Sequence, residues 1–230
     1  MREGRNEGTP VYEGGTSIDA LEGYSRAQIA VIRPNTVLDL GAGAGKYGEI
    51  CREILGSSVQ IVAVEGCRNT VDNVLARKDG LYDEVECKLV QDFVFENSRK
   101  FDLAIFGDVL EHLPRSLAFK VVARAAEFTS NIIVNVPLYE IQQQGVAENP
   151  LEEHQSFFTF ACFPGRFVIR ECHVIAVKGS YYKMNVWIAG NKRKTLKDNI
   201  KKWLLVNFGL RGKCVIEMLG FDSRVDSQRM

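Results

Sequence analysis

Residues 37–48 read VLDLGAGAGKYG, in which an apolar run leads into three closely spaced glycines and then into a helical pattern. Glycine has no side chain, so Gly41, Gly43 and Gly45 let the backbone turn sharply and come close to a ligand. The start of the helix that follows offers free backbone N–H groups. The segment therefore predicts a buried strand, a ligand-binding loop and a helix, with a nucleotide-like ligand at the loop.

Short β-rich segments alternate with helical patterns on both sides of this loop. Such alternation predicts right-handed βαβ units and a parallel sheet with helices on both faces. Two further β-rich runs are separated by a turn too short for a crossover helix, so they should pair as an antiparallel hairpin. The predicted strands are 36–40, 60–64, 86–90, 102–106, 131–136, 166–177 and 181–189, and the predicted helices are 17–32, 47–55, 70–77 and 114–128. The expected fold class is α/β, with a doubly wound, seven-stranded, mostly parallel sheet and a C-terminal antiparallel hairpin.

The composition is that of one ordinary globular domain. The chain has 230 residues, 46% of them hydrophobic and 25% charged, and its 29 basic and 29 acidic residues cancel. This balance lacks the positive field typical of nucleic-acid binders, so nucleic acid is not the expected partner. The six cysteines form no CxxC pair and are expected to be reduced thiols, and no apolar leader is apparent. The expected location is the cytoplasm.

Three regions follow from the pattern. Residues 1–16 are predicted to be a flexible N-terminal arm, 17–190 a single ligand-binding domain, and 191–230 a basic helical C-terminal extension. Three roles stay open for the extension: a solvated helix packed on the domain, a contact with a membrane surface or lipid-linked substrate, and a contact with RNA. The first is the ordinary structural role.

Acidic residues follow or end several predicted strands. Glu65 closes the strand 60–64, where a carboxylate can accept hydrogen bonds from both ribose hydroxyls of an adenosine. Asp39 precedes the glycines and would meet a positively charged amine, which suits the amino-acid end of S-adenosylmethionine better than a pyrophosphate. Asp92 and Phe93 are expected to end the third strand, where they can bond the adenine amino group and cover its ring.

These motifs in this order resemble those of the class I S-adenosylmethionine-dependent methyltransferases, over roughly residues 17–190. The resemblance rests on DLGAGAG, on Glu65, on the run Gln91-Asp92-Phe93 and on FDLAIFGDVLEHL at 101–113. It implies a Rossmann-like fold in which the last strand is antiparallel, and S-adenosylmethionine as cofactor. Carried over, it places a set of residues around that cofactor: Asp39, Gly41, Gly43 and Gly45 at the loop and methionine portion, Glu65 at the ribose, Asp92 and Phe93 at the adenine, and Asp108 at the sulfonium side.

His112 and His154 are the candidate catalytic residues. Methyl transfer to oxygen or nitrogen requires orientation of the acceptor and removal of a proton, and a histidine can accept a proton near neutral pH. The pattern is similar to methyltransferases that modify quinones, sugars and other small metabolites. The predicted function is therefore methyl transfer to an oxygen or nitrogen of a small-molecule or glycan-type acceptor. Glu111-His112 as a structural helix cap is an alternative.

A divalent metal is a further, less favoured cofactor. The segment also resembles the small-RNA 2′-O-methyltransferases, whose metal ligands would correspond to Asp108, Glu111, His112 and His154. The first acid departs from that pattern, since it is an aspartate with a shorter reach. The sequence alone therefore assigns no metal ligands.

Two other function classes stay open. A nicotinamide-dependent oxidoreductase would use Gly43-x-Gly45-x-x-Gly48, but Asp39 and the terminal hairpin disfavour it. A non-catalytic nucleotide-binding protein could keep the same fold. The connection between Pro137 and Pro150 is a candidate acceptor lid, with an ordinary surface loop as the alternative.

Overall fold

The computed structural model describes residues 19–139, 149–177 and 181–190. The predicted arm 1–16, the start of the predicted first helix, most of the candidate lid and the whole extension 191–230 lie outside these residues. Within them, the strands form one seven-stranded sheet in the order β3-β2-β1-β4-β5-β7-β6, with β7 antiparallel to both of its neighbours. The strands are β1 (Thr36–Leu40), β2 (Gln60–Glu65), β3 (Glu84–Cys87), β4 (Phe101–Gly107), β5 (Thr129–Leu138), β6 (Ile169–Val177) and β7 (Tyr181–Ala189).

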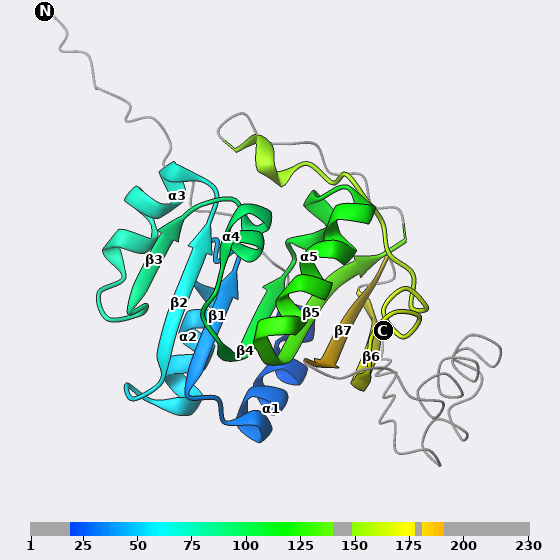
Figure 1. Ribbon diagram of the computed structural model, residues 1–230, viewed down its shortest axis with the longest axis horizontal. Helices are drawn as coiled ribbons and strands as arrows, with labels where there is room; N and C mark the ends of the chain where they lie inside the picture. The colour runs from blue at the N-terminus through cyan, green and yellow to red at the C-terminus, as the bar shows by residue number, and fades with distance from the viewer. Residues whose placement is uncertain (1–18, 140–148, 178–180, 191–230) are drawn as a thin grey trace, which may run out of the picture.

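Helices cover both faces of this sheet (Figure 1). Alternation along β1 explains the two layers, because Val37 packs with residues of α1 and α2, whereas Leu38 and Leu40 pack with residues of α4 and α5. The helices are α1 (Glu22–Ile32), α2 (Lys46–Leu55), α3 (Arg68–Asn73), α4 (Val90–Glu96) and α5 (Arg115–Phe128). Short 3-10 turns are η1 (Asp19–Leu21), η2 (Leu75–Arg77), η3 (Leu110–His112) and η4 (Pro150–Glu152). The predicted fold class is confirmed.

The sequence prediction was wrong around the third strand. The strand expected at 86–90 is β3 at Glu84–Cys87, and the unpredicted helix α4 begins at Val90. Val90, Phe93 and Val94 are buried on one side of α4. Their i, i+3, i+4 spacing is a helical period, and it outweighs the β propensity of Val90.

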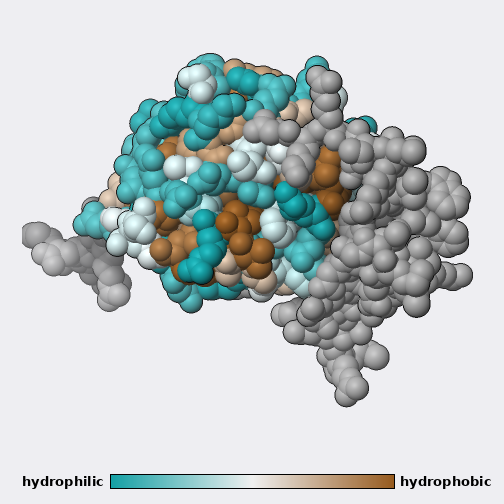
Figure 2. All heavy atoms as spheres, turned by 60° about the horizontal axis from the view of Figure 1, so that its bottom comes forward, coloured by the Kyte–Doolittle hydropathy of each residue, from teal (hydrophilic) through white to brown (hydrophobic). Residues whose placement is uncertain are grey.

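The surface of the described residues is mixed. On the face shown in Figure 2, apolar side chains form small groups separated by polar ones. Large apolar side chains that are exposed come from distant parts of the chain, among them Val31 on α1 and Phe95 on α4. No helix in the described ranges has the length and apolar character needed to span a membrane. The five cysteines within these ranges are free thiols.

Gly107, the last residue of β4, gives a first prediction. A Cβ atom there would lie 1.9 Å from Tyr47 Cε2, and that ring, which belongs to α2, is buried and accepts a hydrogen bond from Asn135 through its hydroxyl. We expect Gly107→Ala to lower the free energy of unfolding by about 1–3 kcal/mol in urea denaturation, because the core must shift to accept a methyl group.

The matched control is Gly23→Ala in α1, where an added Cβ meets nothing within 4 Å. Alanine favours helix, so this variant should be as stable as wild type or up to about 1 kcal/mol more stable. Equal stability of the two variants would contradict the packing described for Gly107.

Candidate active site

The glycine loop lies at the carboxyl end of β1, beside the end of β2. Gly41, Gly43 and Gly45 all have positive φ angles of 77°, 50° and 86°. At position 41 the close packing also requires glycine, because a Cβ atom on Gly41 would lie 2.6 Å from Val109 Cγ2. The backbone N–H of Gly41 donates to the carbonyl oxygen of Val64 at 2.8 Å, which fixes the loop against β2. The predicted loop is thus present and closely packed, at the sheet edge where α/β proteins bind ligands.

Glu65 ends β2, and its two carboxylate oxygens bond the glycine loop and the segment that follows β2. Oε2 accepts a hydrogen bond from Gly43 N at 2.9 Å, and Oε1 accepts one from Cys67 N at 2.8 Å. The side chain is buried, and burial raises the pKa of Glu65 above its usual value. Each carboxylate oxygen has a second lone pair, so Glu65 can still accept from a ligand hydroxyl.

Asp39 lies in β1 just before the loop and is 1% exposed. Tyr82 donates its hydroxyl proton to Oδ2 at 2.6 Å, while Oδ1 is buried without a hydrogen-bond partner among the described residues. The pKa of Asp39 is raised to about 7, chiefly by burial, which outweighs the hydrogen bond from Tyr82, and to a smaller extent by the nearby charge of Glu65. The sequence did not predict the role of Tyr82, since nothing in its local pattern marks it as the partner of a residue in β1.

This raised pKa predicts a pH-dependent stability. Asp39 ionises at a higher pH in the folded state than in the unfolded state, so the ionised form costs stability above about pH 7, and the cost is lost as the pH falls towards 3.8. Asp39→Asn removes the charge, and Tyr82 can still donate to the amide oxygen. We expect the free energy of unfolding of the variant, relative to wild type, to be higher at pH 8 than at pH 5. A difference between the two proteins that is independent of pH would contradict this account.

Asp108 follows β4 and has a left-handed backbone, with φ 55°. Its Oδ2 forms an ion pair with Lys183 Nζ at 2.6 Å, and the lysine side chain is 5% exposed. Lys183 lies opposite Pro137 in the β5–β7 ladder, which brings it to the same edge of the sheet as Asp108. The sequence did not predict Lys183, because a lysine in a strand is ordinarily solvated.

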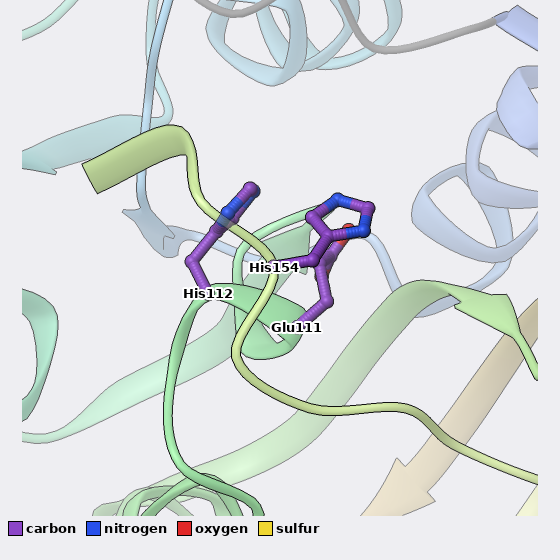
Figure 3. Close-up of side chains that lie close together, drawn as sticks. All are labelled: Glu111, His112 and His154. Carbon is purple, nitrogen blue, oxygen red and sulfur yellow. The ribbon is translucent and has the colours of Figure 1, made fainter. Parts of the chain in front are cut away.

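Glu111, His112 and His154 meet above the end of β4 (Figure 3). The rings of His112 and His154 are 5.0 Å apart between centroids, so the structure brings together the two histidines predicted to be catalytic. Backbone N–H groups of Gln155 and Ser156 donate to the carbonyl oxygen of Glu111 at 2.8 and 3.0 Å. These bonds hold the segment after η4 against η3.

Burial lowers the pKa of His112, although a hydrogen bond to the carbonyl of Glu153 opposes this shift. His112 is therefore neutral at physiological pH, and a neutral imidazole can accept a proton or bind a cation. Burial raises the pKa of Glu111 well above its usual value, and the charge of Asp108 raises it further. The cluster thus combines two imidazoles with a carboxyl group that has been removed from water.

Asp92 and Phe93 do not occupy the predicted positions. Both lie in α4, where Asp92 is exposed and Phe93 is 5% exposed in the hydrophobic core. The ring of Phe93 therefore packs inside the protein and is not available to cover an adenine. The residues directly after β3 are Lys88 and Leu89, and the side chains of Leu89 and Leu151 lie beside Gly66, just after Glu65. The side chains next to Gly66 are therefore apolar, and Asp92 follows them in the first turn of α4.

Comparison with solved structures agrees with the topology. The N-terminal domain of EvdMO1, solved in the presence of S-adenosylhomocysteine and D-fucose, is 14% identical, with a TM-score of 0.55 over 77% of this chain and 85% of that chain. The chain has the fold of the class I methyltransferases. No family model and no curated protein sequence matches it.

Two other solved structures share this methyltransferase fold. The 1,6-didemethyltoxoflavin-N1-methyltransferase of Burkholderia thailandensis, with bound S-adenosylhomocysteine, is 17% identical over 76% of this chain and 80% of that chain, with a TM-score of 0.55. A putative rRNA methylase of Clostridium thermocellum is 13% identical over 78% of this chain and 100% of that chain, with a TM-score of 0.53. Structures with this fold therefore include proteins named for small-molecule and for RNA acceptors.

Proposed function

We propose that the protein transfers a methyl group from S-adenosylmethionine to an oxygen or nitrogen of a small-molecule or sugar-type acceptor. The observation that carries this proposal is the glycine loop held by Glu65 at the carboxyl ends of β1 and β2. In a fold of this class, that edge of the sheet is where a ligand binds.

The residues at this edge fit the cofactor. The loop at Gly41 forms a cradle that a Cβ atom would fill, and Glu65 keeps lone pairs for ribose hydroxyls. Asp39 has a buried oxygen without a partner in the described residues, and a cationic ligand beside the loop would stabilise its ionised form. The antiparallel β7 also favours a methyltransferase over a nicotinamide-dependent enzyme, whose sheet continues with parallel strands. When bound, the cofactor supplies a methyl group that its sulfonium already activates.

On the acceptor side, we assign the catalytic work to His112 and His154. The two rings meet above the end of β4, next to the strand that carries the glycine loop, and partial burial lowers the pKa of His112. Their role is to orient the acceptor group and to lower the cost of removing its proton. The small-molecule acceptor is supported by the balanced net charge of the chain and by similar structures named for such substrates.

The test is an assay of S-adenosylhomocysteine formation with full-length protein and methyl-labelled cofactor. The acceptor panel contains free sugars, nucleotide sugars, hydroxylated aromatics, amines and total RNA. We expect label in a sugar or another small molecule. Label in RNA alone would overturn the proposed acceptor class, and protein that binds neither cofactor nor product would overturn the proposed reaction.

A further inference from the structure

The cluster above β4 has the geometry of a metal site. One side-chain ligand atom each from Glu111, His112 and His154 can be chosen so that all lie within 4.8 Å of one another. Nitrogen and oxygen ligands lie about 2.1 Å from a divalent ion, so two ligands of a tetrahedral ion are about 3.4 Å apart. The three ligand atoms therefore need to approach one another by at most about 1.4 Å to bind one ion together.

Glu111 supplies the second, independent observation. Its side chain is 2% exposed, and Oε2 is buried without a hydrogen-bond partner among the described residues. A buried carboxylate oxygen without a partner is costly, and a bound cation would compensate it. Glu152 adds negative charge near both Glu111 and His112, whereas Lys183 is already paired with Asp108. The charges around the cluster thus favour a cation.

The surroundings orient the ligands. His112 Nδ1 lies 3.2 Å from the carbonyl oxygen of Glu153. In the neutral ring, an Nδ1–H that donates to this carbonyl leaves the lone pair on Nε2. Histidines that bind metals usually have such a hydrogen bond to a carbonyl or carboxylate on the other ring nitrogen. Figure 3 shows that Glu111 and His112 come from η3 and His154 from the segment after η4, so an ion here would link two parts of the chain.

Asp108 is not a member of this set, because it is engaged by Lys183 at 2.6 Å. The ligands are then two imidazoles and one carboxylate, which suit first-row divalent ions such as zinc, manganese or cobalt better than calcium or magnesium. We propose that Glu111, His112 and His154 bind one such divalent ion. Three protein ligands leave coordination positions for water or for an acceptor oxygen.

The role of this metal ion rests on the proposed function. An acceptor hydroxyl bound to the ion would lose its proton to solvent more easily, because the positive charge stabilises the alkoxide. The alkoxide oxygen then forms the new bond to the methyl carbon, the carbon–sulfur bond breaks, and its electron pair stays on sulfur as S-adenosylhomocysteine. In this way the two histidines act on the acceptor as ligands, and the preferred acceptor atom is a hydroxyl oxygen.

The experiment is a titration of chelator-treated, full-length protein with cobalt(II) chloride, followed by calorimetry and by visible absorption. We expect saturable binding of one ion per chain in wild type, with a visible spectrum of a protein-bound ion. Glu111→Gln and His154→Ala should each weaken binding at least about tenfold. Gln155→Ala is the matched control, because Gln155 is exposed in the same segment, and it should bind as wild type does.

Each protein is also titrated with S-adenosylhomocysteine, which reports on the fold and on the proposed function separately. Cobalt binding that is equal in wild type and all variants, or absent in a wild type that binds S-adenosylhomocysteine, would overturn the metal site and leave the methyltransferase proposal standing. A different outcome separates the two proposals the other way. If Glu111→Gln and His154→Ala lose cobalt binding, and the wild type binds cobalt but not S-adenosylhomocysteine, the metal site is supported and the proposed function is overturned.

Discussion

Replacing Glu65 with glutamine is expected to weaken the binding of S-adenosylhomocysteine by about 100-fold, or ~2.7 kcal/mol. Glu65 accepts hydrogen bonds from the backbone N–H groups of Gly43 and Cys67, and the proposal adds the ribose hydroxyls of the cofactor. A glutamine has the same shape, but its amide nitrogen is a donor and would face one of these N–H groups. The variant thus loses an acceptor, a charge and the fixed position of the loop.

The measurement is calorimetric titration of both proteins, with thermal unfolding to verify that the variant is folded. Asp79→Asn is the matched control, because this acid is exposed in the turn before β3. It should bind S-adenosylhomocysteine within about twofold of wild type, since no buried or bonded group is changed. Full affinity in Glu65→Gln, or a similar loss in Asp79→Asn, would contradict the site described above.

The second large effect is expected on turnover. Replacing His154 or His112 with alanine should lower kcat for the best acceptor by roughly 10²-fold or more, because proton removal from the acceptor depends on this pair. The affinity for S-adenosylhomocysteine should stay within about threefold of wild type, since the glycine loop and Glu65 do not depend on the pair. Initial rates and calorimetry with the same protein preparations measure the two effects.

Gln155→Ala again serves as the control, and its kcat should be that of wild type. Loss of cofactor affinity and turnover in equal proportion would indicate that the histidines only stabilise the fold around η3. Unchanged turnover in both variants would show that neither histidine has the catalytic role that we assign.

The glycine loop could be predicted from the sequence because its requirements are local. Positive φ angles at Gly41, Gly43 and Gly45 need glycine, and the apolar run before them needs a buried strand. The antiparallel hairpin was also predictable, since the turn between its strands is too short for a helix. Both features depend on residues that are close together in the sequence, so the sequence pattern is enough to predict them.

The region after β3 could not be predicted in the same way. Val90 has the side chain of a strand residue, and only the packing of Val90, Phe93 and Val94 together makes the segment helical. The buried pair of Asp108 and Lys183 depends on the ladder between β5 and β7, which joins distant parts of the chain. Such tertiary contacts leave no local pattern, so the extent of the third strand was predicted wrongly and Lys183 was missed.

His112 and His154 were expected to act together, and the structure places their rings side by side. The sequence could not indicate the surroundings of Glu111, whose Oε2 atom is buried without a partner in the described residues. The segment after η4 packs on η3 through Gln155 and Ser156, a contact between distant parts of the chain. The step from a histidine pair to a metal site therefore required the structure.

The most direct test of the central claim is a calorimetric titration of wild-type protein with S-adenosylhomocysteine and, separately, with NAD. The fold, the glycine loop and Glu65 predict binding of S-adenosylhomocysteine with a dissociation constant in the micromolar range, about −8 kcal/mol, and no comparable binding of NAD. Binding of NAD without binding of S-adenosylhomocysteine would contradict the account and would indicate that the glycine loop binds a dinucleotide.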